Sequence, residues 1–223
     1  IAQAQLTPNE QAFLLADMAW RVDRESAARK YLRKLDVDAK DAARPLSLSV
    51  VLHHHAAEYE AARKLAEQAI ALAADDAVVL ANLSHWQWDS YCNAQVHGTD
   101  GRVRLDAVRS YATEALRLDP GSLAARKYLW LALLEQGDRP AALRTMTGAY
   151  ELEPRNRDLN LAMGRFLAES SEPAHALPFL ERALGWSHVD EERDEVEALI
   201  VAVATGKPVP RAPACSSPAG EWR

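Results

Sequence analysis

The residues of this sequence whose types most directly suggest chemistry are three consecutive histidines, because imidazole nitrogens are common ligands of transition metals. His53, His54 and His55 fall in a segment that we expect to be helical, where consecutive side chains diverge by about 100°. The three rings therefore cannot converge on one ion. A pair such as His54 with His85 of a neighbouring helix could meet, but protein zinc sites normally use three or more protein ligands. We expect polar histidines here and no metal site.

Nucleophilic catalysis has one candidate, the thiol of Cys92, which lies near His97 in the sequence. On a long helix beside Trp88 and Tyr91, however, a cysteine is more often buried and inert. Carboxylate pairs such as Asp75–Asp76 sit at expected helix starts, where acids favourably oppose the helix dipole. The sequence contains no glycine-rich phosphate loop, metalloprotease helix motif or nucleophile elbow. We therefore predict no catalytic residues, no cofactor and no enzymatic activity.

The charge and composition of the chain exclude several classes of protein. The 26 basic and 32 acidic residues give a net charge of −6 and are interleaved, which argues against nucleic-acid binding. The chain is 48% hydrophobic, as folded proteins are, but no apolar run is long enough to span a bilayer. The two cysteines, Cys92 and Cys215, lie far apart in the sequence, which predicts free thiols rather than a disulfide framework.

The elements that must position these side chains are indicated by small residues that recur with a period of 34 positions, as at Ala115, Ala149 and Ala183. Within each unit the recurring columns fall at i, i+4 and i+7, which is one face of an α-helix. Small side chains there allow two helices to approach closely. The columns are Ala28, Ala62, Val108, Ala142 and Ala176; Leu32, Ala66, Ala112, Met146 and Leu180; and Leu35, Ala69, Ala115, Ala149 and Ala183.

Another helix with its own apolar stripe precedes each small-residue helix, so every unit is predicted to be two helices joined by a turn. The turn position is occupied by Asp23, Ala57, Gly137 and Ser171. Pro120 and Pro154 end two of the units, because proline just past a helix prevents its continuation. The segment Thr7-Pro8-Asn9-Glu10 is a capping box that starts the first helix.

This pattern resembles the tetratricopeptide repeat family, whose unit is a 34-residue helix–turn–helix. The copy at 123–156 matches best, and its matching residues are Leu129, Leu133, Gly137, Ala142, Ala149 and Pro154. The resemblance covers roughly residues 9–190. It implies an all-α fold, a right-handed α-solenoid of antiparallel helix hairpins.

The spacing predicts a solenoid over residues 1–206 and a flexible tail over 207–223. The five expected repeats cover residues 9–42, 43–76, 77–122, 123–156 and 157–190. The third repeat carries a 12-residue insertion, which is expected to lengthen both of its helices into a projecting hairpin. A segment with acids early and apolar residues late, at 190–205, predicts a C-terminal capping helix, because an open solenoid end exposes apolar surface.

In the family that this chain resembles, the first helix of each unit lines a concave face, and this implies the candidate partner-binding residues. They are Phe13, Asp17, Trp20, Arg21, Arg44, His54, His55, His85, Trp88, Asp89, Lys127, Glu135 and Arg165. Aromatic platforms flanked by charges of both signs suit a bound peptide or helix. The alternative for Trp20 and Trp88 is that they fill the hairpin core.

The resemblance thus implies a protein-interaction scaffold that binds a peptide or helix of a partner. The alternative is a structural module of a larger complex, which would self-assemble into a homo-oligomer through its ends. Because the sequence begins at Ile1, we expect a preceding segment such as a signal peptide, a membrane anchor or another domain. Free thiols favour the cytoplasm, whereas a removed leader would favour the periplasm.

Overall fold

The computed structural model describes residues 6–170, 173–187, 190–209 and 215, and this part of the chain is helical with no strand. The prediction of an all-α fold is therefore confirmed. The described residues divide into two compact units, with the boundary between Asp138 and Arg139. None of the described helices is both long enough and apolar enough to cross a membrane.

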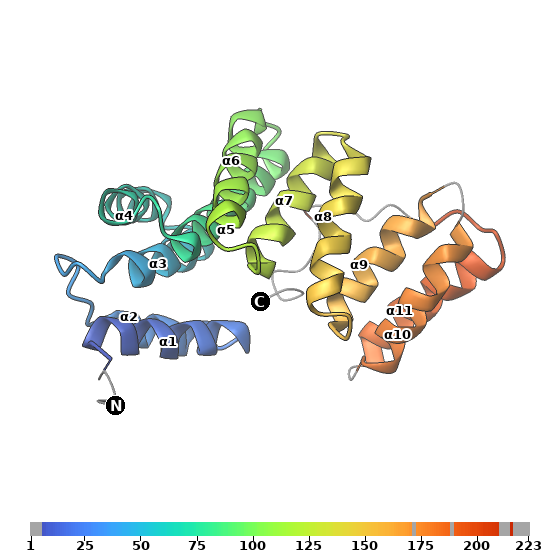
Figure 1. Cartoon of the computed structure of the whole chain (residues 1–223), viewed down its shortest axis with the longest axis horizontal. Helices are drawn as coiled ribbons and strands as arrows, with labels where there is room; N and C mark the ends of the chain where they lie inside the picture. The colour runs from blue at the N-terminus through green and yellow to red at the C-terminus, as the bar shows by residue number, and fades with distance from the viewer. Residues whose placement is uncertain (1–5, 171–172, 188–189, 210–214, 216–223) are drawn as a thin grey trace. The chain divides into compact units, whose positions relative to one another are not determined.

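The first unit consists of helices that pack in consecutive pairs. They are α1 (Pro8–Arg21), α2 (Glu25–Leu32), α3 (Ala43–His55), α4 (Tyr59–Leu72), α5 (Ala77–Val96), α6 (Arg102–Leu118) and α7 (Leu123–Glu135). Helix α1 packs on α2, α3 on α4, and α5 on α6, while the first helices also contact one another in series, α1 with α3, α3 with α5 and α5 with α7 (Figure 1). This second set of contacts brings side chains of successive repeats together.

The helix starts and turns follow the sequence signals. Thr7 forms the predicted capping box with Glu10, and the Asp76 carboxylate accepts hydrogen bonds from the first backbone N–H groups of α5. Between paired helices, Asp23 and Ala57 adopt left-handed backbone with φ of 57° and 60°. A side chain in that region costs about 1–2 kcal/mol, which the packing of the flanking helices must offset. Ser171, the last predicted turn position, lies outside the described residues.

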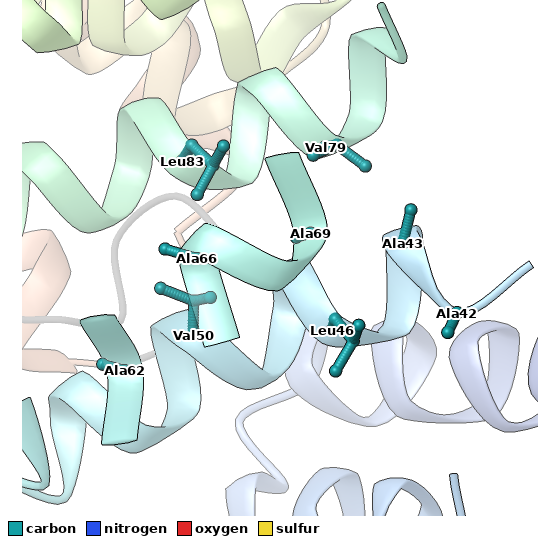
Figure 2. Packing of buried hydrophobic residues seen from close by; sticks show 9 residues of the cluster. All are labelled: Ala42, Ala43, Leu46, Val50, Ala62, Ala66, Ala69, Val79 and Leu83. Atoms are coloured by element: carbon teal, nitrogen blue, oxygen red, sulfur yellow. The ribbon is translucent and has the colours of Figure 1, made fainter. Parts of the chain in front are cut away.

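The core of the first unit is built on the predicted small-residue columns. Ala62, Ala66 and Ala69 lie on α4 and are almost fully buried against α3 and α5 (Figure 2). Leu46 and Val50 of α3, with Val79 and Leu83 of α5, fill the space that the alanines leave (Figure 2). Because the fully buried positions of α4 carry only methyl groups, the helices approach closely, and the larger Leu65 and Ile70 pack at the edge of the cluster.

The hairpin of α5 and α6 is longer than its neighbours, as the inserted residues predicted. Helix α5 has 20 residues and α6 has 17, whereas α3 and α4 have 13 and 14. At the connection Gly101 is buried beneath Tyr91, and a Cβ atom at Gly101 would lie only 2.7 Å from Cδ2 of that ring. Glycine is therefore required for the tight approach, while Val96 and Val103 remain exposed near the tip.

The second unit contains α8 (Arg139–Leu152), α9 (Arg157–Ala168), the short 3₁₀-helix η1 (Pro173–Ala176), α10 (Leu177–Gly185) and α11 (Asp190–Ala204). Helix α9 packs on η1 and α10, and α11 packs on α10 and α9. The buried cluster of this unit is formed by Leu161, Ala168, Ala176, Leu180, Ala183, Val196 and Leu199. Val209 packs against this cluster, and the rest of the predicted tail falls almost entirely outside the described residues.

The prediction of free thiols was wrong. Both Cys92 and Cys215 are disulfide-bonded in the structure, and neither cysteine is a free thiol. The prediction rested on their distance along the sequence, which does not limit their distance in a folded chain. The inference from free thiols to a reducing compartment therefore has no basis.

Candidate functional site

The candidate site lies in the first unit, where side chains from four first helices meet. Trp20 comes from the end of α1, His55 from the end of α3, His85 and Asp89 from α5, and Tyr128 from α7. His85 and Asp89 lie one helical turn apart and so project from the same face of α5. The contacts of α1 with α3, α3 with α5, and α5 with α7 bring these faces together.

The centre of the site is a group of three side chains, His55, His85 and Asp89, which we call the His–Asp cluster. One oxygen of Asp89, Oδ2, lies 3.0 Å from Nε2 of His55 and 3.2 Å from Nε2 of His85. One potential ligand atom from each residue lies within 4.8 Å of the other two. A single carboxylate oxygen therefore joins two imidazoles that belong to neighbouring repeats.

Aromatic rings surround the His–Asp cluster. The Trp20 ring meets the His55 ring edge-on, with centroids 5.0 Å apart, and lies 6.2 Å from the His85 ring. On the other side, Tyr128 stacks on His85 with centroids 4.7 Å apart and an interplanar angle of 18°. The ammonium group of Lys127 lies 5.2 Å from the centroid of Tyr128. The cluster is thus held between apolar ring surfaces.

The cluster is half-buried and carries a fixed negative charge. The side chains of His55, His85 and Asp89 retain 14%, 15% and 23% of their exposure. Burial alone would raise the pKa of Asp89, but the two histidines outweigh it and hold that pKa well below its ordinary value. Burial lowers the pKa of His85, because the charged imidazolium loses its hydration. The arrangement at neutral pH is therefore a carboxylate with an uncharged His85.

Five of the residues predicted from the sequence come together here. Trp20, His55, His85 and Asp89 form the site, and Lys127 borders it through Tyr128. Tyr128 was not predicted, although it stands next to Lys127 in the same helix. Its direction on α7 could not be read from the repeat pattern, because adjacent positions of a helix differ by about 100°.

The prediction named the wrong histidine as the partner of His85. The sequence suggested that His54 could meet His85, but the structure pairs His85 and Asp89 with His55 instead. His54 is buried with its ring 5.0 Å from that of Tyr59, and burial lowers its pKa. The prediction considered only histidines as metal ligands and left out Asp89, so it missed that three potential ligands converge.

The other predicted residues lie away from the cluster. Trp88 is buried with its ring 5.5 Å from that of Tyr91, so it fills the hairpin core, which was the alternative to a binding role. Trp20 is also buried, although its ring forms one side of the site. Phe13 lies on α1 and packs against the core of the first unit. The remaining predicted residues are charged and form polar pairs, which are Arg21–Asp17 at 2.7 Å, Arg44–Asp76 at 2.8 Å, Glu135–Tyr91 at 2.7 Å and Arg165–Glu195. Arg165 belongs to the second unit.

Helix pairs of this length, with first helices that contact in series, define a tetratricopeptide-type fold. The chain is similar to the Thermus thermophilus TPR protein TTC0263, with a TM-score of 0.69 and 17% identity over 86% of this chain and 99% of that one. It is similar to PilF of Pseudomonas aeruginosa, with a TM-score of 0.64 and 15% identity over 89% and 90%. It is also similar to YrrB, described as a TPR protein with an unusual peptide-binding site, with a TM-score of 0.53 and 16% identity over 84% and 90%.

No protein-family model matches the sequence, and no curated protein sequence matches it. The likeness to the solved structures is confined to folds, because sequence identity is below one fifth in all three. The chain therefore has the tetratricopeptide-repeat fold, as the repeat pattern indicated.

Proposed function

We propose that the chain is a protein-interaction scaffold, and that the face formed by α1, α3, α5 and α7 binds an extended peptide or a helix of a partner protein. The observation that carries this proposal is the convergence of Trp20, His55, His85, Asp89 and Tyr128 from four successive first helices. A cluster that draws on four successive first helices lies at the middle of the surface along which an elongated ligand would bind.

The character of these side chains also supports binding. Aromatic rings beside half-buried histidine and aspartate side chains are the kind of anchor that dominates protein interfaces, and Lys127 of α7 adds a positive charge next to them. The tetratricopeptide-repeat fold adds a general reason, since stacked helix pairs expose an extended surface without a catalytic centre. The peptide-binding site in the name of YrrB provides one example among proteins of similar fold.

A selection from a library of random linear peptides on the immobilised chain tests this proposal. We expect Lys127→Ala to weaken binding of a selected peptide by roughly tenfold, or about 1.4 kcal/mol, because an anchoring charge is lost. Lys64→Ala, on the exposed surface of α4, is the matched control and should bind as the wild type does. Fluorescence anisotropy measures both. Equal effects of the two substitutions, or a selection that yields no peptide, would contradict the proposal.

A second candidate function is self-assembly through α1. This helix buries Ala16, Ala19 and Trp20 but leaves a row of apolar side chains exposed, with Met18 at 65% and Val22 at 63%. Leu14 and Leu15 continue the row. Such an exposed apolar row fits a contact with another copy of the chain.

Light scattering across a range of protein concentrations tests self-assembly. We expect the wild type to associate and Met18→Glu to be monomeric, because the carboxylate would be desolvated in the contact. Val96→Glu, which changes an exposed valine on the extended hairpin, should associate like the wild type. A wild-type chain that stays monomeric at every concentration would exclude this function.

A further inference from the structure

We propose that the His–Asp cluster is a binding site for one divalent transition-metal ion of the zinc type, held by Nε2 of His55, Nε2 of His85 and Oδ2 of Asp89. The proposal goes beyond scaffold function and does not depend on it. Two imidazoles and one carboxylate are ligands that zinc uses in proteins, and the three atoms already converge.

The distances between the three atoms fit this role. Zinc binds imidazole nitrogen at about 2.0–2.1 Å and carboxylate oxygen at about 2.0–2.2 Å, so tetrahedral ligand atoms lie about 3.3 Å apart. The two distances from Oδ2 of Asp89 are 3.0 Å and 3.2 Å. The third distance, between the two Nε2 atoms, is within 4.8 Å, so the two rings would draw together around the bound ion. Each Nε2 would give up its hydrogen, which moves to Nδ1 of the same ring as the tautomer changes.

The surroundings of the cluster favour an ion over an empty hydrogen-bonded network. Trp20 and Tyr128 cover two sides with apolar surface, which limits competition from water and strengthens the attraction between a cation and the carboxylate. The ligands come from α3 and α5 and are held by the packing of these helices on each other. The three side chains keep some exposure to solvent, so water or a partner's side chain would complete the tetrahedron.

The neighbouring His53 provides an internal control. His53 lies on the same helix as His55, but its Nδ1 contacts the Glu58 carboxylate instead of the cluster. His54 faces Tyr59. A metal bound generally by surface imidazoles would therefore respond to the loss of His53, whereas a metal bound by the His–Asp cluster would not.

Calorimetric titration of the chelator-treated, untagged full chain with zinc chloride tests the proposal. We expect one ion per chain, with affinity reduced by at least about tenfold in His55→Gln and in His85→Gln, since even the loss of a residue that only supports a ligand costs that much. Asp89→Asn should weaken binding because it removes the anionic member of the three ligands. His53→Gln should bind like the wild type. Circular dichroism shows whether each variant keeps its helices.

An absence of binding to the wild type would overturn the proposal, as would equal binding by the wild type and the His55→Gln and His85→Gln variants. If these variants fail to fold, X-ray absorption of the zinc-loaded wild type decides the matter. The proposal requires two imidazole ligands and at least one oxygen ligand, and a coordination sphere without two imidazoles contradicts it. A rise in the unfolding temperature of the wild type with zinc, absent in the folded ligand variants, is a further expected result.

Discussion

Leu83→Ala is expected to lower the free energy of unfolding by about 2–5 kcal/mol. Leu83 is completely buried on α5, in the cluster that Ala62, Ala66 and Ala69 of α4 form with α3 (Figure 2). Truncation to the methyl group of alanine removes the isopropyl group and loses the transfer free energy of its buried carbons. It also leaves a cavity that the methyl groups of the alanines are too short to fill.

Chemical denaturation followed by circular dichroism measures this effect. The matched control is Leu72→Ala, which makes the same chemical change at an exposed position of α4. It should lower the unfolding free energy by clearly less than Leu83→Ala does, because Leu72 is 40% exposed and its truncation leaves no enclosed cavity. A loss for Leu83→Ala as small as that of the control would show that the first helices do not pack on the small-residue columns as described.

Gly164→Val is expected to destabilise the chain by about 1–3 kcal/mol through overpacking. Gly164 lies on α9, and a Cβ atom there would lie 2.5 Å from Cδ2 and 2.7 Å from Cγ of Leu180. Leu180 is fully buried among α9, α10 and α11, so its side chain has no free space to move into. The gain in helix propensity on replacing glycine does not offset such a clash.

Two further variants test the cause of that loss. Combining Gly164→Val with Leu180→Ala should cost less than the sum of the two single changes, because the second removes the atoms that clash. Gly185→Ala is the matched control in the same unit, since a Cβ atom there would meet nothing within 4 Å. This control should leave stability unchanged or raise it by up to about 1 kcal/mol. Additive losses in the double variant would show that Leu180 is not the obstacle.

The fold could be predicted because its determinants repeat along the sequence. The spacing of Ala62, Ala66 and Ala69 specifies one face of α4, and the same spacing recurs in Val108, Ala112 and Ala115 of α6, all of which are buried. If one column were assigned to the wrong face by a shift of one residue, the same shift would have to occur in every repeat. Repetition thus corrects local ambiguity, and both the helix pairs and the longer third hairpin followed from it.

The site could be predicted only in part, because its geometry depends on single side-chain directions. His54 and His55 are neighbours in sequence, but the His54 ring is buried beside Tyr59, whereas Nε2 of His55 meets the carboxylate of Asp89. Trp88 and Asp89 diverge in the same way, one toward the core and one toward the cluster. Such choices are fixed by the rotation of each helix about its axis, which the contacts between neighbouring repeats determine.

The order of contacts in the first unit has a consequence for how quickly that unit folds. Each of its helices packs on helices that lie one or two positions away along the chain. The backbone therefore closes only short loops, and the entropy lost before the first stabilising contacts form is small. Such a topology has a low contact order, which is typical of domains that fold within microseconds to milliseconds.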